Sequence, residues 1–236
     1  MTKALKAAFP LTLPVLAGYL FMGAAFGVMM DANGYGPLWA GAMSVIVYAG
    51  SGQFVGVSLL ASSYNPLYAF LLILMVNSRH IFYGISLLTR YAGVGWKKPF
   101  LIFWLTDETF SIVCSSRAPK GVDKGWFMFA ISSLHHLYWI TGGVLGNVLS
   151  SIAHFDPRGV DFVMTALFVV IYVEQWLTHK THAAALTGIF APLLALLLFG
   201  SDYFLVPAML FVVIVLTVSR KRLDPGPDEE GEECAL

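Results

Sequence analysis

Apolar runs about as long as a bilayer is thick recur along nearly the whole chain, and they constrain its fold more than any other feature. About 20 apolar residues, within a range of about 17–25, form a helix that crosses the hydrocarbon core of a membrane. On that length the sequence predicts helices near residues 10–30, 38–61, 66–89, 99–116, 126–149, 160–177, 183–199 and 203–219. We therefore expect an all-α polytopic membrane protein with about 8 transmembrane helices, or about 7 if one is re-entrant.

Composition and charge support a membrane protein and exclude a nucleic-acid partner. Apolar residues make up 58% of the chain and charged residues 12%, whereas an ordinary soluble domain is about a quarter charged. The 14 basic and 14 acidic side chains sum to zero, so no large basic surface is available to contact phosphates. We expect one transmembrane domain over residues 1–223, followed by a disordered acidic tail over residues 224–236.

Small residues and basic residues give two further expectations. Gly23 and Gly27 in the first span, and Gly142 and Gly146 in the fifth, follow the pattern that lets helix backbones approach closely in lipid. We interpret them first as packing faces. Placing the N-terminus inside collects most Lys and Arg residues on one side, and only the stretch 90–98 argues against this. The positive-inside bias thus predicts that both termini are cytoplasmic.

The third and fourth predicted spans carry polar groups at their centres. These residues are Asn77, Arg79, His80, Thr106, Asp107 and Glu108. A charged side chain at the bilayer centre costs about 2.5–3.5 kcal/mol on insertion scales. Such groups must face one another, a cavity or a ligand.

Helical spacing suggests that the third span is interrupted. Asn77 and His80 are three residues apart and share a face, while Arg79 is about 200° of rotation from Asn77. A continuous helix would therefore point Arg79 away from the face that carries Asn77 and His80. A break at Asn77-Ser78 near the midplane is therefore an option, because transporter helices are often discontinuous at binding sites.

The charges can be interpreted in two ways. Arg79 could pair with Asp107 or Glu108 only to hold helices together. One arginine cannot neutralise two carboxylates, however, so one acid would be protonated, paired with His80, or available for a cation. An ammonium group or a transported proton would suit that acid.

The second and fifth spans contain weaker candidates. Gly50 and Gly52 flank Ser51 and could loosen the helix, which would let Gln53 and the backbone bind a solute. Gln53 could equally hold two helices together. In the fifth span, Ser132, Ser133, His135 and His136 favour interhelical hydrogen bonding over a proton relay or a ligand role. His136 is kept as a secondary candidate.

Signatures of catalysis and of metal binding are missing from the sequence. It contains no His-Glu-x-x-His, no phosphate-binding loop and no Gly-x-Ser-x-Gly. We expect no cofactor, no metal and no catalytic residue. The remote enzyme alternative is an intramembrane serine hydrolase that uses Ser51 with His80 or His136.

Three elements then point to a family. They are Ala49-Gly-Ser-Gly-Gln53, Asn77-x-Arg79-His80 and Thr106-Asp-Glu-Thr-Phe110. In order and spacing they resemble the AzlC-type branched-chain amino acid permeases, which are named for azaleucine resistance. The resemblance implies export of Leu, Ile and Val across the bacterial cytoplasmic (inner) membrane. It also implies that the chain is the large subunit of a two-component permease, with a small AzlD-type membrane protein as partner.

The resulting hypothesis is alternating access around a midplane site. Carboxylates would face the substrate ammonium group, and Arg79 or an exposed helix N-terminus would face its carboxylate. Proton exchange through Asp107 or Glu108 would supply the driving force. The predicted site comprises Gln53, Asn77, Arg79, His80, Asp107 and Glu108, with Ser51, Thr106 and His136 as secondary members. The alternative is a proton-linked channel or a carrier for another small solute.

Overall fold

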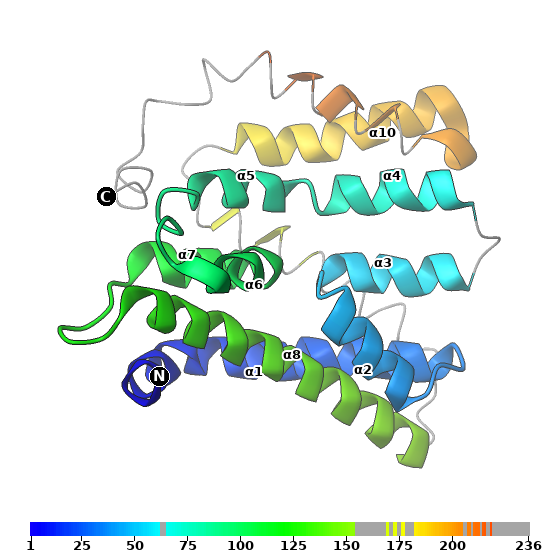
Figure 1. The fold of residues 1–236 in the computed structure, drawn as a ribbon. Helices are drawn as coiled ribbons and strands as arrows, with labels where there is room; N and C mark the ends of the chain where they lie inside the picture. The colour runs from blue at the N-terminus through cyan, green and yellow to red at the C-terminus, as the bar shows by residue number, and fades with distance from the viewer. Residues whose placement is uncertain are drawn as a thin grey trace. The chain divides into compact units, whose positions relative to one another are not determined.

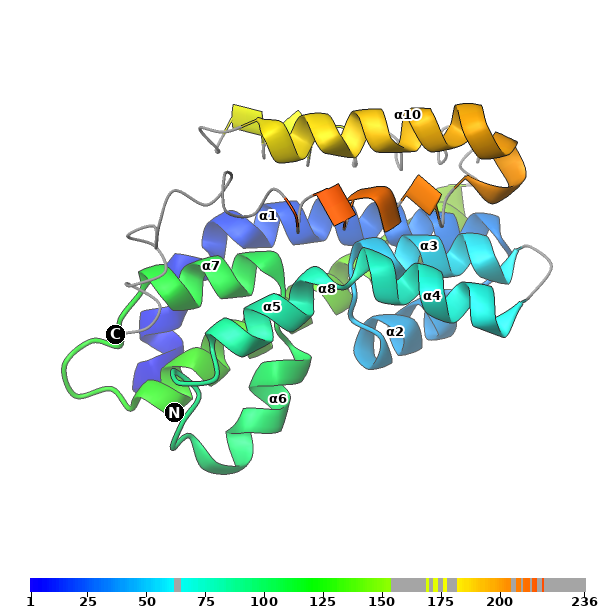
Figure 2. The ribbon, with the colours of Figure 1, turned by 90° about the horizontal axis from the view of Figure 1, so that it is seen from above.

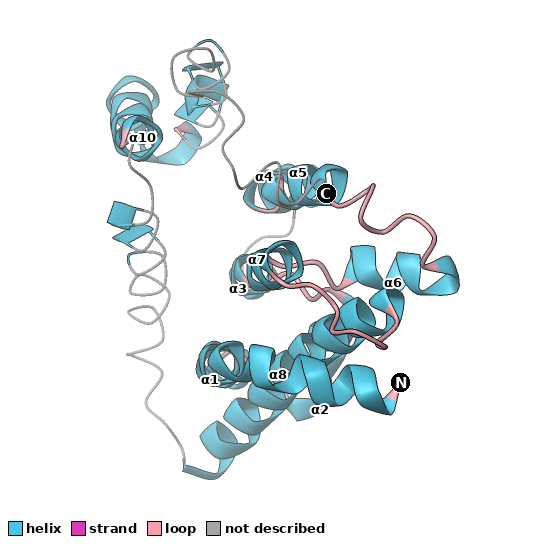
Figure 3. Cartoon of the chain, turned by 90° about the vertical axis from the view of Figure 1, so that its left-hand side faces the viewer, coloured by secondary structure: helices cyan, strands magenta, loops and turns pink. Residues whose placement is uncertain are grey.

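The computed structural model describes most of the first two thirds of the chain and part of the rest. The described residues are 1–61, 65–153, 169, 172–173, 176–177, 182–204, 207–208, 210–212, 214–215 and 218. Within them every regular element is a helix and no strand occurs (Figure 3). The predicted all-α class is confirmed.

The chain divides into two compact units, one of Met1–Asp161 with Glu230–Leu236 and one of Phe162–Glu229. The helices of the first unit are α1 (Thr2–Ala32), α2 (Pro37–Ile46), α3 (Ser51–Leu60), α4 (Pro66–Val76), α5 (Arg79–Ser86), the 3-10 helix η1 (Gly95–Lys97), α6 (Lys98–Phe103), α7 (Asp107–Ser115) and α8 (Lys124–Ala153) (Figure 1). The prediction that residues 1–223 form one domain stays a prediction, and the acidic tail lies outside the described residues.

The second unit contains α10 (Ala183–Tyr203). Pro192 lies inside this helix, and Gly200 interrupts it with a φ of 72° and a ψ of 176°. The ring of His182, just before the helix, stacks on Trp176 with 4.2 Å between centroids. The predicted spans 160–177 and 203–219 lie largely outside the described residues.

Two long helices, α1 and α8, pack along each other and form what we call the long pair. Glycines make this contact close: a Cβ atom on Gly27 would overlap the Gly143 carbonyl oxygen, and one on Gly146 would overlap the backbone of Ala24. Asn147 stabilises the same contact, since its Nδ2 donates a hydrogen bond to the Gly27 carbonyl oxygen at 3.0 Å. The packing role predicted for these glycines is confirmed.

Residues 37–115, which we call the broken segment, contain α2 to α7. Here three predicted spans each consist of two short helices, separated at residues 47–50, 77–78 and 104–106. The break considered at Asn77-Ser78 is present. The prediction of continuous helices over 38–61 and 99–116 was wrong.

Local sequence explains each break. Tyr48 and Gly50 have φ angles of 39° and 46°, which no α-helix tolerates. Asn77 adopts a non-helical conformation after Val76, and its Nδ2 donates back to the Ile73 carbonyl at 3.1 Å. Thr106 is the N-cap of α7, because its hydroxyl accepts the Thr109 N–H at 3.3 Å.

The number of spans is not confirmed. In the described part of the chain, α1 alone is long and apolar enough to cross a bilayer by itself. Shorter apolar helices are α2, α3, α4 and residues 185–200 of α10. Because the breaks shorten the helices, each crossing in the broken segment would need two of them.

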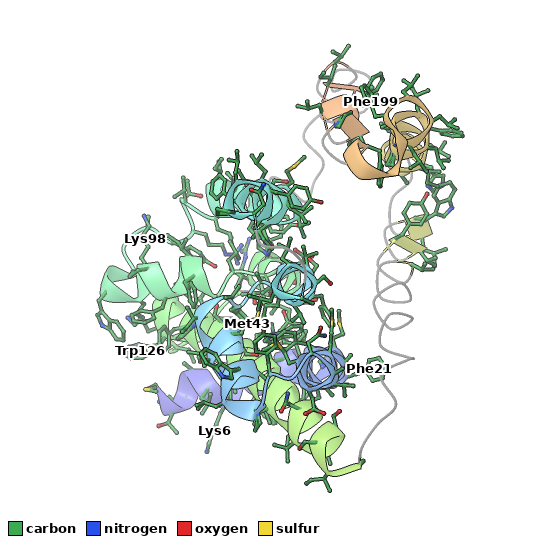
Figure 4. The ribbon with its side chains drawn as sticks, turned by 90° about the vertical axis from the view of Figure 1, so that its right-hand side faces the viewer. Lys6, Phe21, Met43, Lys98, Trp126 and Phe199 are labelled. Carbon is green, nitrogen blue, oxygen red and sulfur yellow. The ribbon has the colours of Figure 1, made fainter. Side chains whose placement is uncertain are left out.

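The outer surface is apolar in both units. Phe21 on α1 is 75% exposed and Leu38 on α2 is 82% exposed. In the second unit, Leu197 is 83% exposed. Figure 4 shows the side chains of Phe21 and Phe199 projecting from their helices. Soluble proteins rarely expose such large apolar surfaces, so these faces are suited to lipid.

Candidate functional site

The start of α7 contacts the long pair through Tyr19 of α1. The Tyr19 hydroxyl donates to Oε2 of Glu108 at 2.6 Å and lies 2.7 Å from Oγ1 of Thr106. Tyr19 is 4% exposed, while Thr106 and Glu108 are half-buried. Two predicted site residues therefore share one buried hydroxyl, which the sequence analysis did not select.

The same start of α7 also contacts α8. The Thr109 hydroxyl lies 3.0 Å from the Thr106 hydroxyl and 2.8 Å from Nδ1 of His135. Thr109 and His135 are both fully buried. The expectation of interhelical hydrogen bonding for His135 is confirmed by this contact.

The start of α3 contacts the long pair next to these groups. Oε1 of Gln53 accepts from Trp139 Nε1 at 2.8 Å and from the Ala49 backbone N–H at 3.2 Å. The Trp139 ring meets the Tyr19 ring edge-on, with 5.5 Å between centroids. Gln53 thus joins helices, as one interpretation expected, and it also satisfies a backbone N–H freed by the break.

Gln53 keeps one donor without a protein partner. It is fully buried, and its Nε2 has no hydrogen-bond partner among the described residues. The hydroxyl of Tyr48, which is 5% exposed, makes no hydrogen bond of ordinary geometry among the described residues, although it interacts with the Tyr19 and Thr106 hydroxyls. Buried polar groups are normally paired, so these two donors at the start of α3 are suited to an incoming polar ligand.

The break between α4 and α5 lies against α3. A Cβ atom on Gly52 would come within 2.5 Å of Asn77 Nδ2, so the missing side chain of Gly52 makes room for Asn77. His80 interacts mainly with its own break, where its Nδ1 lies 3.2 Å from the Asn77 carbonyl oxygen. Asn77 and Gln53 are therefore brought to the same helix start, and His80 stays beside them.

His136 faces the break between α2 and α3. Its Nε2 lies 3.3 Å from the Ser44 carbonyl oxygen, and its ring is 4.5 Å from that of Tyr48. The half-buried Ser51 hydroxyl makes no hydrogen bond to His80 or His136 in the described part of the chain. The geometry therefore gives the hydrolase alternative no support.

The remaining predicted residues are placed less completely. Asp107 occupies the first turn of α7 and is half-buried. The Arg79 backbone begins α5, but its side chain lies outside the described part, so its pairing with Asp107 or Glu108 stays a prediction. No group of three or more potential metal ligands occurs among the described residues.

Two helix starts face the middle of the first unit. Figures 1 and 2 show α3 and α7 beginning near its middle and running apart. Each start carries partial positive charge from the helix dipole. At α7, Thr106 caps the helix and Asp107 and Glu108 compensate that charge, whereas α3 starts after Gly50 with no side-chain cap and no acidic residue in its first turn. One start is thus suited to a cation and the other to an anion.

Sequence reasoning did not select Tyr48, which lies just before α3, or Tyr19, Thr109 and Trp139, which contact predicted site residues. It considered His135 and preferred interhelical hydrogen bonding for it. One signal was available for α7, because a threonine followed by two acids is typical of a helix start. That pattern was interpreted as the middle of a span. No pattern within α1 distinguishes Tyr19 from an ordinary aromatic residue in an apolar helix.

Apolar outer faces, a long apolar helix and a buried polar cluster at helix breaks define an all-α membrane protein. Comparison with known sequences then identifies the family. The family model described as AzlC protein matches residues 14–153, and the chain belongs to this family.

Relatives cover nearly all of the chain. It is 48% identical over 221 residues to the "Branched-chain amino acid transport protein AzlC" of Bacillus subtilis, covering 94% of this chain and 87% of that one. It is 40% identical over 225 residues to an "Uncharacterized membrane protein" of Haemophilus influenzae, covering 95% and 92%. The "Inner membrane protein YgaZ" of Escherichia coli is 28% identical over 214 residues, covering 86% and 84%. No solved structure matches the chain.

Proposed function

We propose that this chain exports branched-chain amino acids across the bacterial cytoplasmic membrane by proton-coupled alternating access. Residues at the starts of α3 and α7 would form the site, and the chain would be the large subunit of a two-component permease. The name of the Bacillus subtilis relative supports the substrate class. The name of the Escherichia coli relative supports the inner membrane as its location.

One observation carries the proposal: the uncapped start of α3 and the acidic start of α7 contact the same buried patch of the long pair. An amino acid is a zwitterion, so its site needs an anion-binding end and a cation-binding end. The α3 start offers the Gln53 amide, the Tyr48 hydroxyl and the helix dipole to a carboxylate. The α7 start offers Asp107 and Glu108 to an ammonium group or a proton.

Selection of a branched apolar side chain needs an apolar wall nearby. The Phe54 ring, one residue beyond Gln53, meets Phe26 edge-on with 5.8 Å between centroids. The Phe26 ring also stacks with Trp139 at 6.4 Å. This aromatic cluster adjoins the polar start of α3 and is suited to a Leu, Ile or Val side chain.

Broken helices supply a physical route to alternating access. Freed backbone groups at a break are tolerated in a membrane only where protein or a solute satisfies them. Short helices joined by breaks can pivot while the long pair, fixed by close glycine contacts, stays in place. We therefore expect the broken segment to move relative to α1 and α8 during transport.

The test is leucine counterflow and pH-driven leucine accumulation in membrane vesicles that contain the full chain with its candidate small subunit. Glu108→Gln should still exchange leucine but lose accumulation, because an amide cannot release a proton. Asp107→Asn should lose binding. Asp123→Asn is the matched control, since Asp123 is exposed and an asparagine can keep its N-cap bond to the Trp126 N–H.

Three results would contradict the proposal. Absence of counterflow for all branched-chain amino acids would exclude them as substrates, and saturable flux of another solute would favour a different carrier. Proton conductance without solute would favour a channel. Restored accumulation in the double variant Arg79→Gln with Glu108→Gln would show that these charges only neutralise each other.

A further inference from the structure

We propose that Glu108 exchanges its proton with His135 through the hydroxyl groups of Tyr19, Thr106 and Thr109. The inference rests on the proposed function and names the internal route for its coupling proton. Glu108 belongs to α7 and His135 to α8, and neither the sequence motifs nor the comparisons assign a role to His135. It would act as a proton carrier that does not touch the substrate.

The four hydrogen bonds form an unbroken chain. From Glu108 Oε2 the Tyr19 hydroxyl is 2.6 Å away, and the Thr106 hydroxyl is 2.7 Å further on. The Thr109 hydroxyl follows at 3.0 Å and Nδ1 of His135 at 2.8 Å. Each distance lies within the usual range for hydrogen bonds between such groups. A proton can therefore move by short hops without any side chain changing place.

Chemistry fixes the direction of these bonds when Glu108 is ionised. A carboxylate only accepts, so Tyr19 must donate its single proton to Glu108. Tyr19 oxygen then accepts from Thr106, Thr106 accepts from Thr109, and Thr109 accepts from the Nδ1–H of His135. The chain thus selects the His135 tautomer that carries its proton on Nδ1 and leaves Nε2 as an acceptor.

Transfer along this chain balances in protons and charge. When a proton binds to Nε2, His135 becomes an imidazolium and its Nδ1 proton passes to Thr109. Thr109 passes its own proton to Thr106, Thr106 to Tyr19, and Tyr19 to Glu108. At the end Glu108 is neutral, His135 is neutral with its proton on Nε2, and every hydroxyl again holds one proton. The reverse transfer restores the first state: the Glu108 proton returns through Tyr19, Thr106 and Thr109 to Nδ1 of His135, and His135 releases the proton on Nε2.

The His135 end of the hydrogen-bonded chain is closed in this conformation. Nε2 of His135 is buried and has no hydrogen-bond partner among the described residues, and His135 as a whole is fully buried. A proton can reach Nε2 only after neighbouring elements move. Proton access at His135 is therefore linked to conformation, which is what coupling to alternating access requires.

Few other titratable groups face the hydrogen-bonded chain from Glu108 to His135. From α1 the titratable group is Tyr19, a member of the hydrogen-bonded chain, whose ring is 5.6 Å from that of His135. On α8 the Tyr138 ring is 6.4 Å from the His135 ring. Tyr48, between α2 and α3, lies close enough to Glu108 for electrostatic interaction. Asp107 is the neighbour of Glu108 in the first turn of α7. Tyrosines are neutral near pH 7, so Glu108 and His135 are the groups whose charge can change along this route.

The deciding variant is Thr109→Val, which keeps the shape of the side chain and removes the hydroxyl in the middle of the chain. In the vesicles in which the wild-type chain shows leucine counterflow, Thr109→Val should keep counterflow and lose at least about tenfold of pH-driven accumulation, because positioned proton transfer contributes about 10²–10⁴-fold. Leucine-dependent proton flux, followed with an enclosed pH dye, should fall in parallel. Thr109→Ser should restore both.

Thr12→Val is the control for loss of a buried hydroxyl. Thr12 bonds to Tyr138 at 3.1 Å, is fully buried and lies outside the chain from Glu108 to His135. It should leave the ratio of accumulation to counterflow at the wild-type value. Wild-type accumulation in Thr109→Val, or equal loss of counterflow and accumulation, would overturn the relay. Absence of counterflow in the wild type would overturn the proposed function and the relay with it.

Discussion

The long pair and the broken segment use small residues and polar groups in opposite ways. In α1 and α8, glycines such as Gly27 and Gly146 bring two continuous helices together. In the broken segment, Gly50 instead permits a backbone turn that ends helical structure. Polar side chains of the long pair meet the breaks, where Tyr19 contacts Glu108 and Trp139 contacts Gln53.

This difference would let one membrane protein combine a rigid part with a part that moves. Continuous helices satisfy their own backbone groups, so the long pair needs no ligand to remain stable in lipid. At a helix break, backbone groups lose their hydrogen bonds within the helix, and a helix starts inside the membrane. These backbone groups require other hydrogen-bond partners. We infer that the long pair is the fixed frame and the broken segment the part that recognises and moves solute.

The largest expected effect comes from crowding the long pair. Gly27→Val should lower the free energy of unfolding by about 3 kcal/mol or more, because the new side chain overlaps backbone atoms of α8. Gly18→Val, in the same helix, meets nothing within 4 Å and serves as control. Thermal unfolding in detergent, followed by size-exclusion chromatography, measures both. Equal unfolding midpoints for Gly27→Val and Gly18→Val would show that α1 and α8 can shift to make room for the new side chain.

Between the two regions, the bond from Trp139 to Gln53 can be tested by a double-mutant cycle. Gln53→Leu should cost about 1–3 kcal/mol, because it leaves the Trp139 and Ala49 N–H groups buried without an acceptor. Trp139→Phe should cost less, and the coupling energy should be about 1 kcal/mol. If Gln53 also binds substrate, Gln53→Leu loses leucine counterflow more severely than Trp139→Phe. Additive stabilities would contradict the direct bond.

Within the broken segment, two alanine substitutions should have opposite signs. Gly50→Ala should destabilise by about 1–2 kcal/mol, since its φ of 46° and ψ of −108° suit only glycine. Gly84→Ala, inside α5 with open space around it, should stabilise by about 0.5–1 kcal/mol through helix propensity. Detergent unfolding compares them. A neutral Gly50→Ala would mean that the break is not held by this backbone conformation.

The smallest effect is expected for Ser51→Ala. Ser51 is half-buried and begins α3, and its side chain caps no helix. Stability should change by less than about 0.5 kcal/mol, and leucine counterflow should be largely intact. Loss of all activity, together with labelling of Ser51 by a serine-reactive probe, would instead revive the hydrolase alternative.

Much of the fold and part of the site could be predicted from sequence. The length of the apolar runs indicated an all-α membrane protein, and spacing of small residues indicated the close contact of the first and fifth spans. Helical periodicity around Asn77 indicated a break, because one face could not hold all of its polar neighbours. Thr106 and Asp107 were placed in the middle of a span, although they mark a helix start. The reason is that hydropathy averaged over an apolar run does not reveal an N-cap within it.

By itself, the sequence determined that the protein lies in lipid, that it is helical, and which of its polar residues need a partner there. These follow from properties that each residue or each helix has alone. Only the tertiary structure decided that Tyr19 and His135, whose rings lie 5.6 Å apart, both contact the start of α7 and join Glu108 in one hydrogen-bonded chain. The physical reason is that such contacts depend on where helices end and which faces meet. Periodicity along one helix contains no information about the helix that packs against it.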